Sequence, residues 1–232
     1  MIKRLAVLLL LLGLAGIFSS LLLNYVPDQA LNQSARYYAD HTAQDLGAAN
    51  IVTAIVVTYR GLDTLGEVTV LFLTAAIVGL VLAQRNRLKP EHHNRPPAGE
   101  LLSTGTRLLI PLILLLGVYV FANGHLTPGG GFQGGAILAS AMLLQLLSDP
   151  LRHFSHRLIT LTESVSGLLF VVIGVLGVFL AGGFLDNRIL PVGEFGSLFS
   201  AGAIPLIYTL IGLKVGAEFS SMLFNLSETE SS

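Results

Sequence analysis

Long stretches without a charged residue constrain the fold of this 232-residue chain more than any other feature. A helix that crosses a bilayer needs about 20 mostly apolar residues in succession, and the core of a soluble domain needs no such run. Only 12% of the residues are charged, against about 25% in ordinary soluble domains. The charge-free runs are 5–27, 46–59, 68–84, 108–148, 164–185 and 195–213. The pattern predicts a polytopic membrane protein.

Composition excludes several other classes of protein. The chain is 53% hydrophobic with a formal net charge of −1, which argues against a disordered chain, a basic nucleic-acid binder and an ordinary soluble enzyme domain. It has no cysteine, so disulfides, cysteine-ligated zinc and ordinary iron–sulfur ligation are excluded. We therefore expect no resident cofactor, no metal site and no nucleic-acid partner, and the surrounding lipid is the expected environment.

The fold class that we predict is all-α, with about six transmembrane helices. The run 108–148 is too long for one span, and its glycine-rich centre, from His125 to Gly135, divides it into two helices. We interpret the first span as a retained helix rather than a signal peptide, because its apolar run continues to Leu23 and no clear A-x-A site follows. The predicted spans are 5–23, 64–84, the two halves of 108–148, 158–181 and 198–224.

The segment 48–60 is apolar over only about 12 residues, which is short for a span. We interpret it as a short re-entrant or interfacial helix. Its backbone then needs cover from protein, which indicates partner subunits. With six spans both termini are cytoplasmic, and the positive-inside rule is satisfied. The basic residues on that side are Lys3, Arg4, Arg85, Arg87, Lys89, Arg95, Arg152 and Arg157, whereas Arg36, Arg60 and Arg188 fall outside.

A basic linker that contains prolines, 85–100, divides the chain. We expect a membrane unit over 1–84, a four-helix membrane domain over 101–226 and a short polar tail over 227–232.

Asp63 and Glu67 form the first cluster of charges close to a predicted span. They are four residues apart and share one helix face, following Gly61, which permits a break in the chain. Two carboxylates this close in a poorly solvated place resist joint ionisation, so one of them can take up and release a proton. In the structural alternative, Asp63 faces the helix dipole at a helix start and Arg60 neutralises it.

Lys214 and Glu218 form the second cluster, again four residues apart, in the last predicted span. Ionisable residues inside a bilayer are costly and indicate function by default. The pair can move charge, or it can be an ion pair that only holds helices together. Glu163 enters the fifth span by about one turn and is either part of the same path or an interfacial residue. Asp186 and Glu194 fall in an outer loop, where we expect both to be solvated.

The glycine-rich break contains Pro128, Gly129, Gly130, Gly131, Gly134 and Gly135. Its GxGxxG spacing does not indicate a dinucleotide site, because no strand precedes it and no βαβ unit surrounds it. We interpret it as a broken helix, followed by small residues four apart that let a neighbouring helix approach closely. His125 at the break can relay protons or be a hydrogen-bonded structural residue.

Two segments resemble known families. The segment from Asn50 to Glu67 (NIVTAIVVTYRGLDTLGE) resembles the C-terminal part of the large A-type polypeptide of Mrp-type cation/proton antiporters, and equally the E-type polypeptide of membrane-bound hydrogenases. The segment from Leu101 to about Phe224, with Gly124–Gly135 as its signature, resembles the B-type polypeptide (MnhB) of the same antiporters. The chain is thus similar to a fusion of an E-like and a B-like subunit.

The resemblance implies a membrane subunit of a multisubunit Mrp-type Na⁺/H⁺ antiporter in the inner (cytoplasmic) membrane. It would be no enzyme by itself, and its partners would be the large antiporter-like and small membrane subunits. Asp63 and Glu67 match carboxylates that the family associates with ion movement, so Na⁺ and H⁺ are the expected cargo. Two alternatives stay open: an ion-pumping module of a membrane-bound hydrogenase or related redox complex, and a scaffold without an ion path.

Overall fold

The computed structural model describes residues 2–25, 30–88, 98–149 and 155–231, and its regular elements in those ranges are all helices. Most of the predicted linker 85–100 therefore lies outside the described residues. The elements are α1 (Ile2–Leu23), α2 (Gln33–Leu46), α3 (Ile51–Ala54), the π-helix η1 (Ile55–Tyr59), α4 (Gly61–Leu88), α5 (Glu100–Ala122), α6 (Gly131–Ser148), α7 (His156–Leu180), the 3₁₀-helix η2 (Asn187–Ile189) and α8 (Ile204–Ser231).

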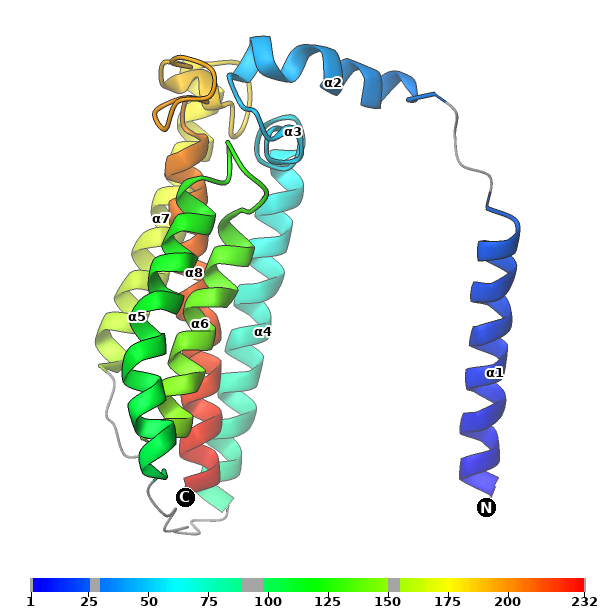
Figure 1. The fold of residues 1–232 in the computed structure, drawn as a ribbon, viewed down its shortest axis with the longest axis vertical. Coiled ribbons are helices and arrows are strands. Elements are labelled where there is room, and N and C mark those ends of the chain that lie inside the picture. Colours follow the sequence, from blue (N-terminus) through cyan, green and yellow to red (C-terminus); the bar gives the residue numbers. More distant parts are fainter. Residues whose placement is uncertain (1, 26–29, 89–97, 150–154, 232) are drawn as a thin grey trace. The chain divides into compact units, whose positions relative to one another are not determined.

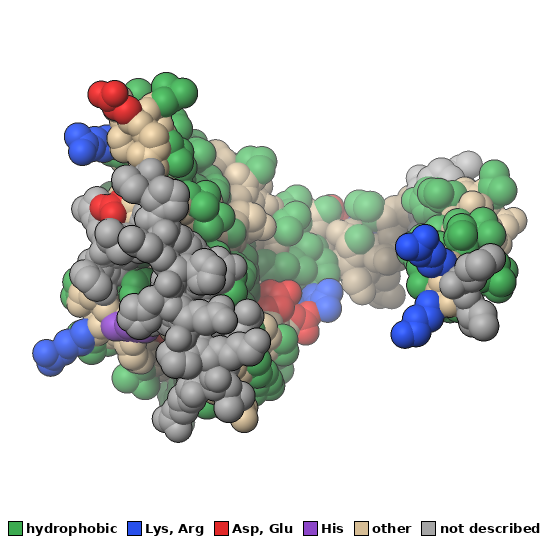
Figure 2. Space-filling view, turned by 90° about the horizontal axis from the view of Figure 1, so that it is seen from below, with side chains coloured by type: hydrophobic (Ala, Val, Ile, Leu, Met, Phe, Trp, Pro, Cys, Tyr) green, Lys and Arg blue, Asp and Glu red, His purple; other side chains and the backbone are tan. Residues whose placement is uncertain are grey.

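Six of these helices are long and apolar enough to cross a membrane, which confirms the predicted fold class. They are α1, α4, α5, α6, α7 and α8. Leucine, valine and phenylalanine side chains cover much of their outer surface, and Figure 2 shows this apolar character from one end. A soluble protein of this size does not expose so many large apolar side chains, because contiguous apolar patches are normally small.

The chain forms two compact units, Met1–Tyr37 and Tyr38–Ser232. In the first unit, α1 is a single helix with none of its apolar window buried. Leucines cover α1 on all sides, and a helix that is hydrophobic all round belongs in lipid or in a protein core.

The second unit is a helical bundle built around α8. This helix packs against α4, α5, α6 and α7, and 61% of its apolar window is buried, the largest share among the six spans. In Figure 1, α8 runs between the other helices of this unit. A charged residue on the inner faces of α8 is therefore shielded from lipid by protein.

Within this unit the helices alternate in direction (Figure 1). The starts of α4, α6 and α8 lie at one end, together with α3 and the loop 181–203. The starts of α5 and α7 lie at the other end, with the last residues of α8. Arg60 and Arg188 thus lie at the opposite end from Arg157, as the six-span topology requires.

Glycines set the spacing around α6. A Cβ atom on Gly135 would lie 2.7 Å from Cβ of Val215 and 2.8 Å from the carbonyl oxygen of Gly212, both on α8. A Cβ atom on Gly134 would lie 2.7 Å from the carbonyl oxygen of Gly117 on α5. The backbone of α6 therefore approaches both neighbours more closely than any other residue type permits.

The break between α5 and α6 spans 123–130. Gly129 and Gly130 have φ angles of 159° and 154°, a backbone conformation that residues with a Cβ atom rarely adopt. Pro128 directly precedes them, and Gly130 occupies the N-cap position of α6. These residues reverse the chain, so α5 and α6 run antiparallel side by side.

The structure differs from the sequence prediction at the start of α8 and at α2. Helix α8 begins at Ile204 rather than at 198, because Ala201 and Gly202 have φ angles of 64° and 57°, which a right-handed helix cannot include. Helix α2 was not predicted, because a search for charge-free runs passes over a helix that contains Asp40 and Asp45. Its Thr42 and Leu46 are buried nevertheless, one turn apart on the same face.

The loop 181–203 corrects the expectation that Asp186 is solvated. Asp186 is only 8% exposed, and its carboxylate accepts a hydrogen bond of 2.9 Å from Nε of Arg188. It also caps η2 by accepting from the backbone N–H of Arg188. Glu194, by contrast, is exposed as expected. The ion pair therefore has a local structural role in ordering this loop.

We expect this loop to loosen in acid. The Arg188 side chain holds the pKa of Asp186 below its usual value of 3.8, with burial opposing this effect. Because the folded pKa is the lower one, the stabilisation is complete above pH 3.8 and is lost as pH falls through the folded value. The protection of the amides 183–188 against hydrogen exchange, corrected for the intrinsic rate, should fall in that window. Asp186→Asn should show reduced protection above pH 3.8 and no acid step, and should match the unmodified chain at the lowest pH; an unchanged profile would contradict the assignment.

Candidate functional site

A buried ion pair lies in the middle of α8. Nζ of Lys214 lies 2.5 Å from Oε1 of Glu218, and the two side chains are 8% and 0% exposed. Their spacing of four residues places them on one face, a turn apart. Burying two charges is costly, and their mutual attraction offsets that cost only when the geometry is good. Oε2 of Glu218 has no hydrogen-bond partner within the described residues, so one acceptor oxygen stays available.

Neighbouring helices complete the environment of Lys214. Its Nζ lies 5.2 Å from the centre of the Phe72 ring on α4, within the range of a cation–π interaction. A Cβ atom on Gly167 of α7 would lie 3.3 Å from Cδ of Lys214, so glycine leaves room for the aliphatic stem. Two helices other than α8 thus fix where the ammonium group lies.

A cavity of about 260 Å³ between α4 and α7 leads to Lys214. Glu163 of α7 and Thr69 of α4 line it together with Lys214. Glu163 is half-buried and faces the same cavity as Lys214, which pairs with Glu218. The structure therefore brings together three of the residues selected from sequence: Glu163, Lys214 and Glu218.

This cluster has two carboxyl groups and one ammonium group. With all three ionised, the group has one uncompensated negative charge in a region of low dielectric constant, which is unfavourable. Uptake of a proton or a monovalent cation would neutralise it. The arrangement is chemically suited to exchange positive charge through the cavity.

Asp63 and Glu67 lie apart from this cluster, near the start of α4. Asp63 forms an ion pair with Arg60, and the two side chains are 51% and 62% exposed. Glu67 is also exposed, and neither carboxylate lines the cavity at Lys214. Within this chain, Asp63 lies in the first turn of α4 beside Arg60. This is the arrangement expected if Asp63 only stabilises the start of the helix. Gly61 lies against Leu185, where a Cβ atom would be 2.9 Å from Cβ of that residue.

His125 lies in the break between α5 and α6 and is fully buried. Burial lowers the pKa of its imidazole, and backbone groups of Ser197 and Leu198 partly oppose that shift. Neither ring nitrogen makes a well-aligned hydrogen bond within the described residues. At neutral pH the ring is therefore uncharged, and it is not part of the Lys214 cluster.

A neutral polar network next to His125 was missed from sequence. Thr53 donates a hydrogen bond to the carbonyl oxygen of Gly124 at 2.6 Å and accepts one from Tyr208 at 3.2 Å. Asn50 donates to the carbonyl oxygens of Gly124 and Thr127. The network fastens α3 to the glycine-rich break and to α8. A search for charged residues cannot find it, although Asn50 in its N-cap position was a usable signal.

Two family models match the chain. One describes a domain related to the MnhB subunit of Na⁺/H⁺ antiporter and covers residues 101–221. The other describes MbhE, the E-type polypeptide of MBH, and covers residues 3–98. The matches confirm both resemblances found in the sequence and the order in which they are fused.

Three relatives illustrate the match. The A/B-type polypeptide of a probable K⁺/H⁺ antiporter from Rhizobium meliloti is 28% identical over 240 residues, which cover 90% of this chain and 23% of that protein. A chain of the membrane-bound sulfane sulfur reductase, an archaeal respiratory membrane complex, is 39% identical with a TM-score of 0.81, covering 97% of this chain and 98% of that one. A chain of the Mrp complex from Dietzia sp. DQ12-45-1b is 27% identical with a TM-score of 0.76, covering 96% and 25%.

Proposed function

This chain belongs to the family with a domain related to the MnhB subunit of Na⁺/H⁺ antiporter, and we propose from that membership that it is a membrane subunit of a multisubunit Mrp-type cation/proton antiporter. The observation that supports this function best is the buried pair Lys214–Glu218, reached by a cavity that Glu163 lines. Na⁺ and H⁺ are the proposed cargo, and the chain has no catalytic role of its own.

In this proposal Glu163 exchanges a proton or cation with the cavity. Lys214 then shares its positive charge between Glu163 and Glu218, so the uncompensated charge can move along α7 and α8 without leaving the protein interior. Asp63 and Glu67 provide a second acidic site on α4, which partner subunits would cover. His125 is a further relay candidate at the same end as α3.

Neutralising the acidic pair on α4 tests the path. We expect Asp63→Asn or Glu67→Gln to lower Na⁺-dependent proton exchange in membrane vesicles by about tenfold or more, because a neutral amide cannot take up a proton or balance a cation. Complex assembly should persist, because each amide keeps the size and shape of the carboxylate that partner subunits would cover. The measurement is Na⁺-driven dequenching of a pH-sensitive dye, with subunit content measured by immunoblot.

Glu194→Gln is the matched control, because Glu194 is an exposed carboxylate in the loop 181–203 and has no proposed role. It should leave exchange unchanged. Normal exchange in both α4 variants would remove Asp63 and Glu67 from the mechanism.

A second candidate function has a specific observation in its favour. The sulfane sulfur reductase chain matches this one over nearly its full length, whereas this chain spans only a quarter of the Mrp chain. The same ion chemistry could then be driven by electron transfer in partner subunits. Affinity purification in mild detergent with mass spectrometry separates the two: antiporter-like and small membrane subunits alone support the antiporter, and added iron–sulfur or hydrogenase-type subunits support the redox complex.

We also propose the cytoplasmic (inner) membrane as the location, with both termini cytoplasmic. The basis is the distribution of basic residues, since Arg157, the end of α4 and the start of α5 lie on one side and Arg60 and Arg188 on the other. Other Mrp-type or hydrogenase-type subunits are the proposed partners.

A further inference from the structure

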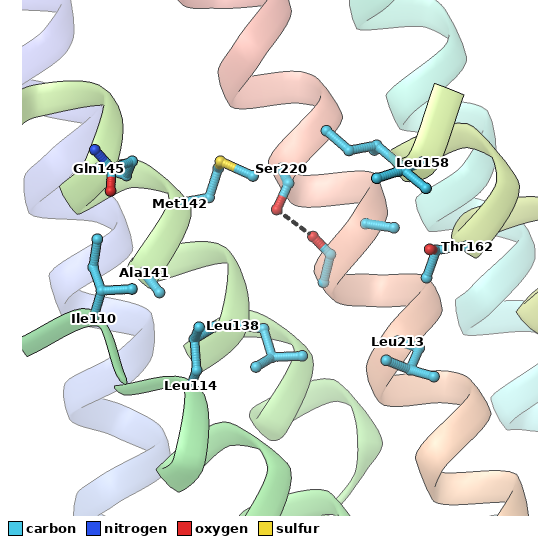
Figure 3. A pocket seen from close by; sticks show the side chains of 13 residues that line it. Ile110, Leu114, Leu138, Ala141, Met142, Gln145, Leu158, Thr162, Leu213 and Ser220 are labelled. Atoms are coloured by element: carbon cyan, nitrogen blue, oxygen red, sulfur yellow. Dashed lines mark hydrogen bonds between the residues drawn. The ribbon is translucent and has the colours of Figure 1, made fainter. Parts of the chain in front are cut away.

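An open groove of about 400 Å³ lies between α5 and α7, and residues of α6 and α8 complete its lining. Figure 3 shows its walls: Ile110 and Leu114 come from α5, Leu158 and Thr162 from α7, and Leu213 and Ser220 from α8. Ser220 donates its hydroxyl hydrogen to the carbonyl oxygen of Gly216 at 2.6 Å, so this polar group is already satisfied. Gln145 and Thr162 are the other polar side chains of the lining and the rest are apolar or glycine, so the groove suits a mainly apolar occupant.

The length of the groove limits what can fill it. Along α8 it extends from Leu213 to Ser220, about 10 Å at 1.5 Å per residue. A partner helix that crosses the bilayer needs a contact surface over about 30 Å. The groove is only about one third as long, so a single flexible hydrocarbon chain fits it better than a rigid helix about 10 Å wide.

Two of the helices that wall this groove, α5 and α7, each have an arginine near the lining residues. Arg107 precedes Ile110 by three residues on α5 and shares its helix face, and Arg157 directly precedes Leu158 on α7. Both arginines are exposed, and no carboxylate pairs with either within the described residues. Helices α5 and α7 start at the same end of the bundle (Figure 1), and both arginines lie in the first half of their helix, toward that end. The positive N-terminus of α7 lies there as well.

We propose that this groove binds an anionic phospholipid. One acyl chain lies along Leu114, Leu158 and Leu213, and the headgroup lies toward the end of the bundle where Arg107 and Arg157 are exposed. Arginine side chains extend along apolar surface and place their guanidinium groups at the level of the lipid headgroups. Basic pockets between membrane helices recognise anionic headgroups by this chemistry. The site is independent of the ion path proposed above.

The absence of tryptophan permits a direct test. Leu158→Trp places a single fluorophore in the groove, and Leu108→Trp places a control on α5, at an exposed position two residues before Ile110 and outside the groove. The full chain is reconstituted in phosphatidylcholine vesicles that contain a minor fraction of chain-brominated phosphatidylglycerol or chain-brominated phosphatidylcholine, and quenching is compared. Leu114→Trp probes the same groove from α5 if Leu158→Trp does not fold.

We expect the groove tryptophan to be quenched at least about twofold more strongly by brominated phosphatidylglycerol than by brominated phosphatidylcholine, because only the former has a net negative headgroup. The control tryptophan should show no preference, and Arg107→Gln with Arg157→Gln should abolish the preference in the groove. Equal quenching by both lipids, or a preference that survives both arginine substitutions, would overturn the proposal. Quenching of the control but not of the groove residue would also overturn it, because protein would then fill the groove.

Discussion

Lys214→Met is expected to prevent stable accumulation of this chain in the membrane. The substitution leaves the Glu218 carboxylate fully buried without its partner, and removing one member of a buried ion pair costs about 3–5 kcal/mol. That loss is a large fraction of the stability of a typical domain. The measurement is the yield of monodisperse protein in detergent, together with its thermal unfolding midpoint, compared with the unmodified chain.

A double variant separates the role in folding from the role in transport. Lys214→Met with Glu218→Leu replaces the pair by apolar residues of similar size, which is often neutral or stabilising. We expect this variant to recover the yield but not the cation-dependent proton exchange. Normal exchange in the recovered protein would show that the pair only holds helices together, as in the scaffold interpretation. Failure of the double variant to recover would contradict the electrostatic explanation of the single one.

Charge-free runs predict most of this fold because the bilayer leaves few choices. Backbone groups have no water to bind in lipid, so each long apolar run has to be a helix. The division of 108–148 into two helices followed from the glycines at its centre. Helix α2 was missed because its charged residues interrupt any apolar run. The hydrogen bonds among Asn50, Thr53 and Tyr208 were missed because they depend on which segments the fold brings together.

The candidate site was predictable in part for the same reason. Lys214 and Glu218 are conspicuous in an apolar helix, and their spacing alone predicts contact. The position of Glu163 beside the cavity depends on how α7 packs on α8. A local sequence pattern does not specify that packing. For Asp186 the sequence prediction was wrong. We expected a solvated carboxylate because the residue lies in a loop, but Arg188, two residues away, forms an ion pair with it and allows it to be buried.

Gly135→Leu is expected to disrupt the bundle as severely as loss of Lys214. Even a Cβ atom at this position would lie 2.7 Å from Cβ of Val215 and 2.8 Å from the backbone oxygen of Gly212, so α6 and α8 have to move apart. Inserting extra carbon atoms into a packed core costs about 1–3 kcal/mol, and more where the obstacle is backbone. We expect low yield and early thermal unfolding, with only partial recovery on adding Val215→Gly.

Gly105→Ala is the matched control, because Gly105 lies in α5 and a Cβ atom there would meet no neighbouring atom within 4 Å. Alanine there should stabilise α5 by about 0.5–1 kcal/mol, through helix propensity alone. If Gly135→Leu were equally harmless, the close approach of α6 and α8 would be wrong. Val215 is adjacent to Lys214 on α8, so the same approach fixes the rotation of α8 that directs Lys214 toward Phe72 and the cavity. The glycines of α6 therefore matter for the ion pair although none of them touches it.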